Sequence, residues 1–159
     1  MNTFIKCYQE IERIEKLNFI NSRIEEIYKL SSLFKFINNL KFLNISRLNT
    51  IIYKEDLFRF LINIIFLRNL EHLSLNQCCI DDKSFDLLII SLQHLFNLKV
   101  LLLRGNAISD VGVLNLVKIF DFLNNLNELD MTKNSITKIG MKTIDENKGK
   151  LKKLKKFIV

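Results

Sequence analysis

Short apolar segments with strand-like alternation recur along the chain at a nearly constant interval. The two clearest, residues 98–108 and 126–136, align position by position as L-x-x-L-x-(L/M)-x-x-N-x-I. Residues 70–80 repeat the pattern with cysteine at the asparagine position, and looser copies precede them. The segments begin at Ile14, Leu40, Leu70, Leu98, Leu126 and Leu154, so the last four starts are evenly spaced. This spacing predicts one supersecondary unit repeated along nearly the whole chain.

Each unit is predicted to be a strand, a turn and a helix. In L-x-x-L-x-L the second and third leucines alternate with other residues at period two, which turns the leucines inward and the intervening residues toward solvent. Helical spacing follows in residues 84–92, 112–120 and 140–146; in the best-formed case Leu116 and Phe120 follow Gly112 at spacings of four and eight. Since one unit cannot bury its apolar face alone, stacked units must form the core.

A turn asparagine or cysteine follows each of the three clearest strands: Cys78, Asn106 and Asn134. An amide side chain can satisfy backbone groups of neighbouring coils, and a small buried cysteine can occupy the same place. The second coil departs from the pattern, with Leu48 at the asparagine position, and residues 51–53 are an alternative closing segment for its strand. Ser84 also stands where the next two repeats have glycine.

The pattern resembles the leucine-rich-repeat family, and the period of about 28 residues with a long helical half resembles the cytoplasmic ribonuclease-inhibitor-like subfamily. The resemblance implies a single α/β solenoid over residues 1–159, with a curved parallel sheet on the concave side and helices on the convex side. Apolar residues at helical spacing predict an N-terminal capping helix over residues 1–13. The array is similar in length to that of tropomodulin, which closes with a terminal helix; no such helix follows Val159 here, so we do not infer actin binding from the sequence.

The outward strand positions form the predicted concave face, where this architecture usually binds partners. We expect a protein partner to bind either on this concave face or along the open last strand. Phe42, His72, Val100 and Leu102 form a candidate protein-binding patch on this face. The alternative is that they are isolated exposed apolar residues, which are common on protein surfaces. The full set of candidate partner-binding residues is Phe42, Asn44, His72, Ser74, Asn76, Val100, Leu102, Arg104, Glu128 and Asp130.

The net charge of +7 is concentrated in one segment, residues 148–156, with the sequence K-G-K-L-K-K-L-K-K. Its lysines are Lys148, Lys150, Lys152, Lys153, Lys155 and Lys156. Removing these six from the 24 basic residues leaves 18 against 17 acidic residues. The lysines could contact RNA phosphates in a ribonucleoprotein or another large assembly. Alternatively, Lys155 and Lys156, placed in the last strand, could protect an unpaired sheet edge.

No motif in the sequence supports catalysis. The chain lacks G-x-S-x-G, H-E-x-x-H, a Walker loop and paired C-x-x-C motifs, and only His72 and His94 could serve as histidine bases. His72 with Cys78 and Cys79 lacks a fourth metal ligand, and adjacent cysteines on a turn do not easily face one ion. We therefore expect no enzyme activity, metal, cofactor or small-molecule substrate.

Cysteine usage and hydropathy favour an intracellular compartment. Three cysteines are too few for a secreted disulfide framework. Charged residues interrupt the first twenty positions, and the most apolar run, residues 57–67, is too short to span a bilayer. The sequence predicts a cytoplasmic protein, with a nuclear one as the alternative, and no membrane association.

Overall fold

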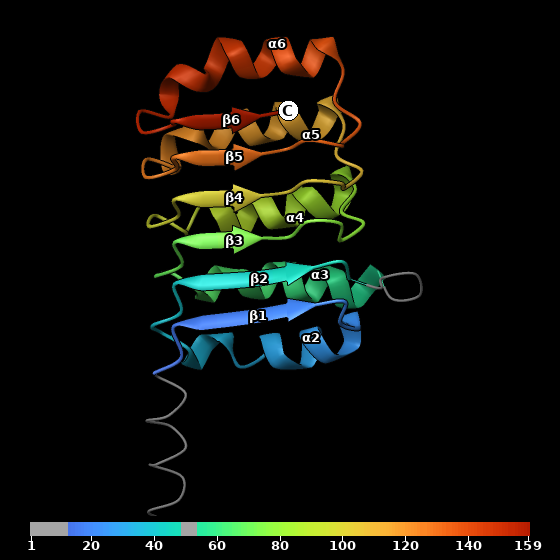
Figure 1. Cartoon of the computed structure of the whole chain (residues 1–159), viewed down its shortest axis with the longest axis vertical. Helices are drawn as coiled ribbons and strands as arrows, with labels where there is room; N and C mark the ends of the chain where they lie inside the picture. The colour runs from blue at the N-terminus through green and yellow to red at the C-terminus, as the bar shows by residue number, and fades with distance from the viewer. Residues whose placement is uncertain (1–12, 49–53) are drawn as a thin grey trace, which may run out of the picture.

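The chain winds into six successive coils, each contributing one strand to a single parallel sheet (Figure 1). The computed structural model describes residues 13–48 and 54–159. The strands follow the order β1-β2-β3-β4-β5-β6, so each pairs with its neighbours in sequence. Their bounds are β1 Lys16–Ile20, β2 Phe42–Ser46, β3 His72–Ser74, β4 Val100–Leu102, β5 Glu128–Asp130 and β6 Lys156–Ile158.

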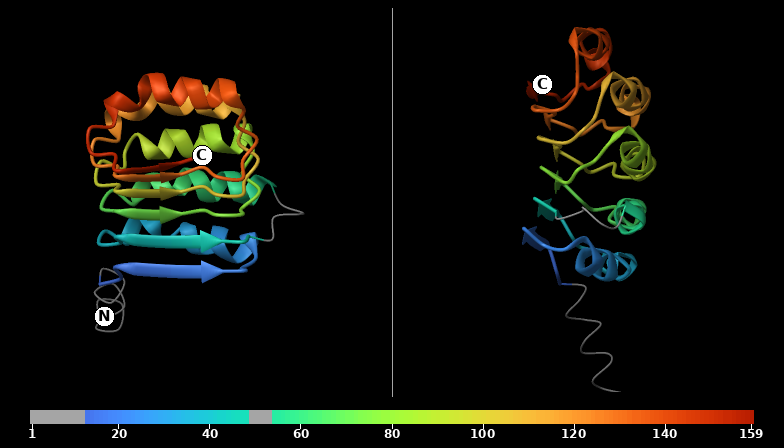
Figure 2. Two further views of the ribbon diagram at one scale, coloured as in Figure 1. Left: turned by 45° about the horizontal axis from the view of Figure 1, so that its top comes forward. Right: turned by 90° about the vertical axis from the view of Figure 1, so that its right-hand side faces the viewer.

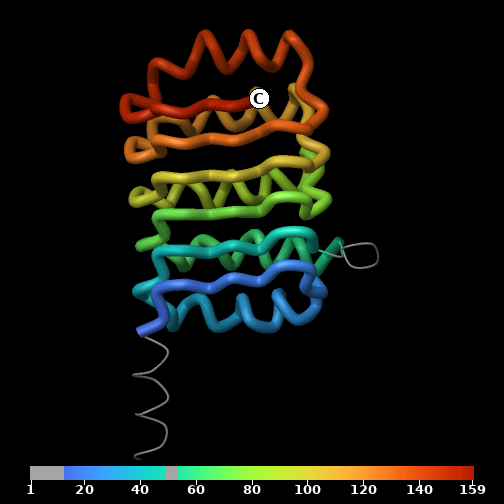
Figure 3. The backbone as a smooth tube through the Cα atoms, in the orientation of Figure 1, coloured from blue at the N-terminus to red at the C-terminus, as the bar shows by residue number. Residues whose placement is uncertain are grey.

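Helices cover one face of this sheet and leave the other open, as the edge-on view in Figure 2 shows. The α-helices are α2 Ile24–Ser31, α3 Lys54–Asn63, α4 Asp82–Leu92, α5 Asp110–Leu116 and α6 Lys138–Asn147. Short 3₁₀ helices lead back toward the sheet: η1 Phe34–Phe36, η2 Ile64–Phe66, η3 Val117–Phe122 and η4 Lys148–Lys150. This arrangement confirms the predicted α/β solenoid, and the backbone trace in Figure 3 makes its repeating coil visible.

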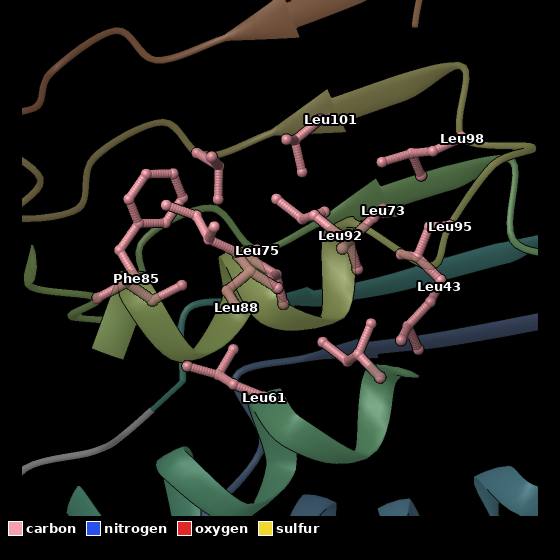
Figure 4. Close-up of a cluster of buried hydrophobic side chains, with 14 of the residues drawn as sticks. Leu43, Leu61, Leu73, Leu75, Phe85, Leu88, Leu92, Leu95, Leu98 and Leu101 are labelled. Atoms are coloured by element: carbon pink, nitrogen blue, oxygen red, sulfur yellow. The ribbon is translucent and has the colours of Figure 1, made fainter. Parts of the chain in front are cut away.

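The leucine pattern explains the core. Each strand begins at the second position after the first apolar residue of its motif, so the strand starts keep the spacing of the sequence pattern. Leu43, Leu73, Leu101 and Leu129 lie in register across four strands and are fully buried. Figure 4 shows three of them, Leu43, Leu73 and Leu101, in one buried cluster with Leu88 and Leu92 of α4. Burial of each such side chain contributes about 2 kcal/mol.

The turn asparagine joins adjacent coils through its amide. The Asn106 side chain accepts hydrogen bonds from the backbone N–H groups of Cys78 (2.9 Å) and Ile80 (3.1 Å). It donates to the carbonyls of Leu75 (2.9 Å) and Leu103 (2.8 Å). Because these groups lie in the interior, where water cannot satisfy them, the amide fixes the path of two consecutive turns.

A second link between coils explains why Ser84 replaces glycine. The Asp82 carboxylate accepts from the Ser109 backbone N–H (2.8 Å) and from the Gly112 N–H (3.1 Å). A Cβ on Gly112 would lie 2.7 Å from Asp82 Oδ1, so the aspartate requires glycine in the next coil. Lys54 occupies the corresponding helix start in the preceding coil, and Ser84 forms a capping box with Asp81 instead.

A ladder of asparagines in the loops before the strands was not predicted. Asn69, Asn97 and Asn125 each donate to a backbone carbonyl of the preceding coil, at 2.7, 3.2 and 2.7 Å. The signal was present in the sequence, since asparagine directly precedes the first leucine in these three repeats. The ladder fixes the spacing of the coils on the side where the strands begin.

Two predicted features fall outside the described residues: the capping helix predicted over residues 1–13, of which residues 1–12 are not described, and the closing role of residues 51–53. At the other end, β6 begins at Lys156, so the prediction that Lys155 lies in the last strand is wrong. The backbone N–H groups of both lysines nevertheless donate to the Asn127 carbonyl. Across residues 13–48 and 54–159, no helix has the length and apolar character needed to traverse a bilayer.

Candidate functional site

The parallel register arranges the outward side chains of the strands in rows across the open face of the sheet. One row runs through Lys16, Phe42, His72, Val100, Glu128 and Lys156. The next runs through Asn18, Asn44, Ser74, Leu102, Asp130 and Ile158. The predicted concave positions therefore do lie on one face, although they come from four different coils.

An aromatic stack occupies the first row. The rings of Phe42 and His72 lie 4.3 Å apart with an 18° angle between their planes, and Lys16 Nζ lies 4.6 Å from the Phe42 centroid. Burial lowers the pKa of His72 and Lys16 lowers it further, against an opposing effect of Glu128. The imidazole is consequently neutral at pH 7, which makes it a weakly polar extension of the Phe42 surface.

A chain of hydrogen bonds crosses the sheet beside this stack. Ser46 Oγ donates to Asn44 Oδ1 (2.6 Å) and lies 3.3 Å from Ser74 Oγ. Ser74 Oγ accepts from Asn76 Nδ2 (3.2 Å), and Asn76 Oδ1 accepts from the Arg104 backbone N–H (2.8 Å). Ser74 is only 4% exposed, so the expectation that it faces solvent is wrong. Its hydroxyl is enclosed by its polar neighbours and positions them.

These polar residues form the floor of a hollow of about 550 Å³ on the open face. The full lining is Ile20, Asn44, Ser46, Arg47, His72, Ser74, Asn76, Gln77, Leu102 and Arg104. Six of the ten candidate residues therefore line one cavity: Asn44, His72, Ser74, Asn76, Leu102 and Arg104.

Arg47 and Gln77 also line this hollow, although neither was predicted as a partner-binding residue. Both directly follow the outward positions of their coils and have positive φ angles, 58° and 55°. This left-handed conformation is uncommon for residues other than glycine. Gly105 occupies the equivalent position in the next coil and has the same left-handed conformation (φ 71°). Alignment of the repeats with this glycine could therefore have identified the turn that carries Arg47 and Gln77.

Acidic side chains gather at the opposite end of the face and are already engaged. Lys156 Nζ donates to Glu128 Oε1 at 2.5 Å. Asp130 Oδ1 accepts from the backbone N–H and the hydroxyl of Thr132, at 2.9 and 2.7 Å. Glu128 and Asp130 thus lie on the predicted face but outside the hollow.

Most of the C-terminal lysines have partners within the fold. Lys148 pairs with Asp145 (2.7 Å) and Lys150 with Asp121 (3.9 Å), while Lys153 donates to Asn125 (2.7 Å). With Lys156 on Glu128, four of the six are engaged, and Lys152 and Lys155 are the exposed remainder. The RNA-binding alternative stays a prediction.

The turn cysteine offers no nucleophile. Cys78 is fully buried, its Sγ donates to the Ile45 carbonyl (3.0 Å), and burial raises its pKa to about 12. A thiol with that pKa is not a nucleophile at neutral pH. No group of three or more His, Cys, Asp or Glu side chains in the described ranges could hold a metal ion.

Comparisons with known proteins agree with the repeat architecture. The family described as "Leucine Rich repeat" matches residues 66–84, 94–117 and 122–144. No curated protein matches the chain at a significant level. One similar solved structure is that of leiomodin-1 Actin-Binding Site 2, with 22% identity and a TM-score of 0.66 over 85% of this chain and 78% of that one.

A second similar structure is the C-terminal domain of tropomodulin from Caenorhabditis elegans. It shares 16% identity, with a TM-score of 0.70 over 86% of this chain and 81% of that one. At these identities the similarity establishes the fold. The ribonuclease-inhibitor-like subfamily stays a prediction. The three segments that match the family model, the repeat pattern of the sequence and the six-coil parallel solenoid together show that this chain is built of leucine-rich repeats.

Proposed function

We propose that this protein is a non-enzymatic interaction module that binds a protein partner on the concave face of its sheet. The observation that carries the proposal is the continuity of the partly exposed strip formed by Phe42, His72, Val100 and Leu102 with the adjacent hollow. An aromatic and aliphatic centre with polar surroundings is the usual anatomy of a protein-binding surface.

The rigidity of the sheet supports the same proposal. The strip and the hollow rest on consecutive parallel strands whose inward leucines are fully buried. The polar floor is held by hydrogen bonds among its own side chains, so little ordering is needed when a partner arrives. Preorganisation of this kind raises affinity by lowering the entropy cost of binding.

The test compares two paired variants of the full chain. Phe42→Ala with Leu102→Asp disrupts the strip, whereas Phe96→Ala with Leu114→Asp makes the same chemical changes at exposed sites away from the concave face, 54% and 50% exposed. Proteins retained by the immobilised wild-type chain are identified by mass spectrometry, and circular dichroism verifies that all variants fold. Selective loss with the first pair supports the concave site, and equal retention by both pairs overturns it.

Actin is the first defined partner to test. The solved leiomodin-1 structure with this fold carries the description Actin-Binding Site 2, and that description motivates the assay. Purified actin is incubated with the wild-type chain and with both paired variants. Binding that disappears only with the concave-face pair would identify actin as a partner of this surface.

A further inference from the structure

Two arginines on the rim of the concave hollow have no acidic partner among the described residues. Arg47 and Arg104 are both exposed, and neither takes part in any ion pair of residues 13–48 and 54–159. The lysines that flank the face at Lys41, Lys99 and Lys156 are by contrast paired with glutamates. The positive charge at the hollow is therefore available to a ligand.

Within the described part of the chain, the hollow is lined by no carboxylate. Its lining consists of two arginines, one histidine, polar uncharged residues and the apolar side chains of Ile20 and Leu102. The acidic residues of the face, Glu128 and Asp130, lie on β5 and are engaged by Lys156 and Thr132. Charge complementarity therefore selects an anionic ligand.

The Arg47 guanidinium is oriented before any ligand binds. Its Nε donates to Gln77 Oε1 (3.2 Å), and the Gln77 side chain lies against Gly105, where a Cβ would approach Gln77 Cγ to 2.9 Å. This leaves the terminal nitrogens of Arg47 without a partner among the described residues. A planar guanidinium held in this way can bind a carboxylate through two parallel hydrogen bonds.

The size of the hollow argues for a segment of polypeptide as its occupant. Its volume of about 550 Å³ exceeds what one carboxylate fills and lies within the range of sites that enclose several side-chain groups. Ile20 and Leu102 offer apolar contacts beside the polar floor, which suits the aliphatic stems of glutamates.

We infer that this hollow binds an acidic segment of the protein partner, with side-chain carboxylates held between Arg47 and Arg104. The inference rests on the proposed function, because it specifies the chemistry recognised at the concave face. The Arg104 main chain is fixed beside the hollow, because Asn76 Oδ1, in the turn after β3, accepts a hydrogen bond from the Arg104 backbone N–H.

The test uses two defined peptides and the isotopically labelled full chain. One peptide is a capped octamer alternating glutamate and glycine, and the other carries glutamine at every glutamate position. Titration followed by NMR should shift the backbone amides of Gln77 and Arg104 with the glutamate peptide alone. Arg47→Gln and Arg104→Gln should each weaken binding about tenfold, the value of one charge-assisted hydrogen-bond pair.

Arg68→Gln is the matched control, since it removes the same charge from an exposed arginine outside the hollow. Equal weakening by this variant, equal binding of the glutamine peptide, or shifts confined to residues 148–156 would each overturn the inference. Displacement of the glutamate peptide by an equimolar concentration of inorganic phosphate would also overturn it, because it would make the hollow a phosphate site.

The two proposals fail separately. If a partner is lost with the Phe42→Ala and Leu102→Asp pair but retained at full affinity by the Arg47→Gln and Arg104→Gln double variant, acidic recognition is wrong and the concave binding face stands. If neither variant affects the partner, the concave face itself is wrong.

Discussion

Replacement of Asn106 by alanine should be among the most destabilising substitutions in this chain. The amide makes four backbone hydrogen bonds, to the N–H groups of Cys78 and Ile80 and to the carbonyls of Leu75 and Leu103. The Leu103 carbonyl keeps a second donor, Asn134 Nδ2, at 3.0 Å. Asn106→Ala therefore removes the partner of three interior backbone groups and leaves a small cavity.

The expected magnitude follows from that count. A buried donor or acceptor left without a partner costs about 1 to 3 kcal/mol. Water entering the cavity offsets part of the loss, so we expect Asn106→Ala to lower the free energy of unfolding by about 3 to 5 kcal/mol. Asn106→Cys should cost less, because Cys78 fills the equivalent place in the preceding coil, where its Sγ donates to the Ile45 carbonyl.

Asn134→Ala is the matched comparison in the next coil. Its amide accepts from Ile108 N–H (3.1 Å) and donates to the carbonyls of Leu103 and Met131, but the side chain is only half-buried. Solvent can replace more of these bonds, so we expect a loss of about 1 to 2 kcal/mol.

Urea unfolding followed by circular dichroism at about 222 nm measures these differences, since the chain has no tryptophan to report by fluorescence. Comparison requires that the slopes of the transitions remain equal. A loss below about 1 kcal/mol for Asn106→Ala, or an equal loss for Asn134→Ala, would refute the reasoning that the buried amide is what joins the turns.

Three further predictions concern the coil contacts and the cysteines. Gly112→Ala should lower the melting temperature by several degrees in differential scanning calorimetry, because overpacking against Asp82 and Ile108 costs about 1 to 3 kcal/mol. The same substitution should cost less in an Asp82→Ala background, where one of the two contacts is gone, and an unchanged melting temperature would contradict the contact. Iodoacetamide should label Cys79 and spare Cys78 in the native chain, as peptide mass spectrometry would show, whereas equal labelling would contradict the burial of Cys78. Hydrogen bonds from the Thr137 hydroxyl and backbone N–H hold the pKa of Asp110 below its ordinary value. The ionised carboxylate therefore stabilises the fold fully above the ordinary aspartate pKa, and this stabilisation is lost as the pH falls through the lowered pKa of Asp110. Asp110→Asn should therefore make the free energy of unfolding fall less steeply with decreasing pH in the acid range. An unchanged pH dependence would count against the contact between Asp110 and Thr137.

The sequence predicted the repeat because the same burial requirement recurs every coil. An inward leucine such as Leu101 must alternate with outward neighbours, and its counterpart Leu129 must do the same one repeat later. Spacing therefore specified the strand positions and their shared face, and the resemblance to leucine-rich repeats implied that the strands are parallel. It also placed Asn106 at a turn, although its four partners became visible only in the structure.

The composition of the candidate site depended on tertiary contacts. Ser74 has the alternation of an outward residue, yet hydrogen bonds with Ser46 and Asn76 enclose it. Arg47 belongs to no recognisable sequence motif. A left-handed backbone conformation and a hydrogen bond from its Nε to Gln77 Oε1 in the next coil place it at the hollow. Such contacts depend on side-chain conformation across coils, which periodicity does not encode.

The sequence by itself determined that the chain is a solenoid of strand and helix units, because the pattern of buried leucines admits one repeating coil. Only the tertiary structure decided where its charge is usable. Three of the six lysines at residues 148–156 pair with the carboxylates of Asp145, Asp121 and Glu128. By contrast, two arginines far apart in sequence have no acidic partner among the described residues and line one hollow. The reason is physical: ion pairing depends on distances between atoms of different coils, whereas burial of a repeated leucine is fixed by its position in the unit.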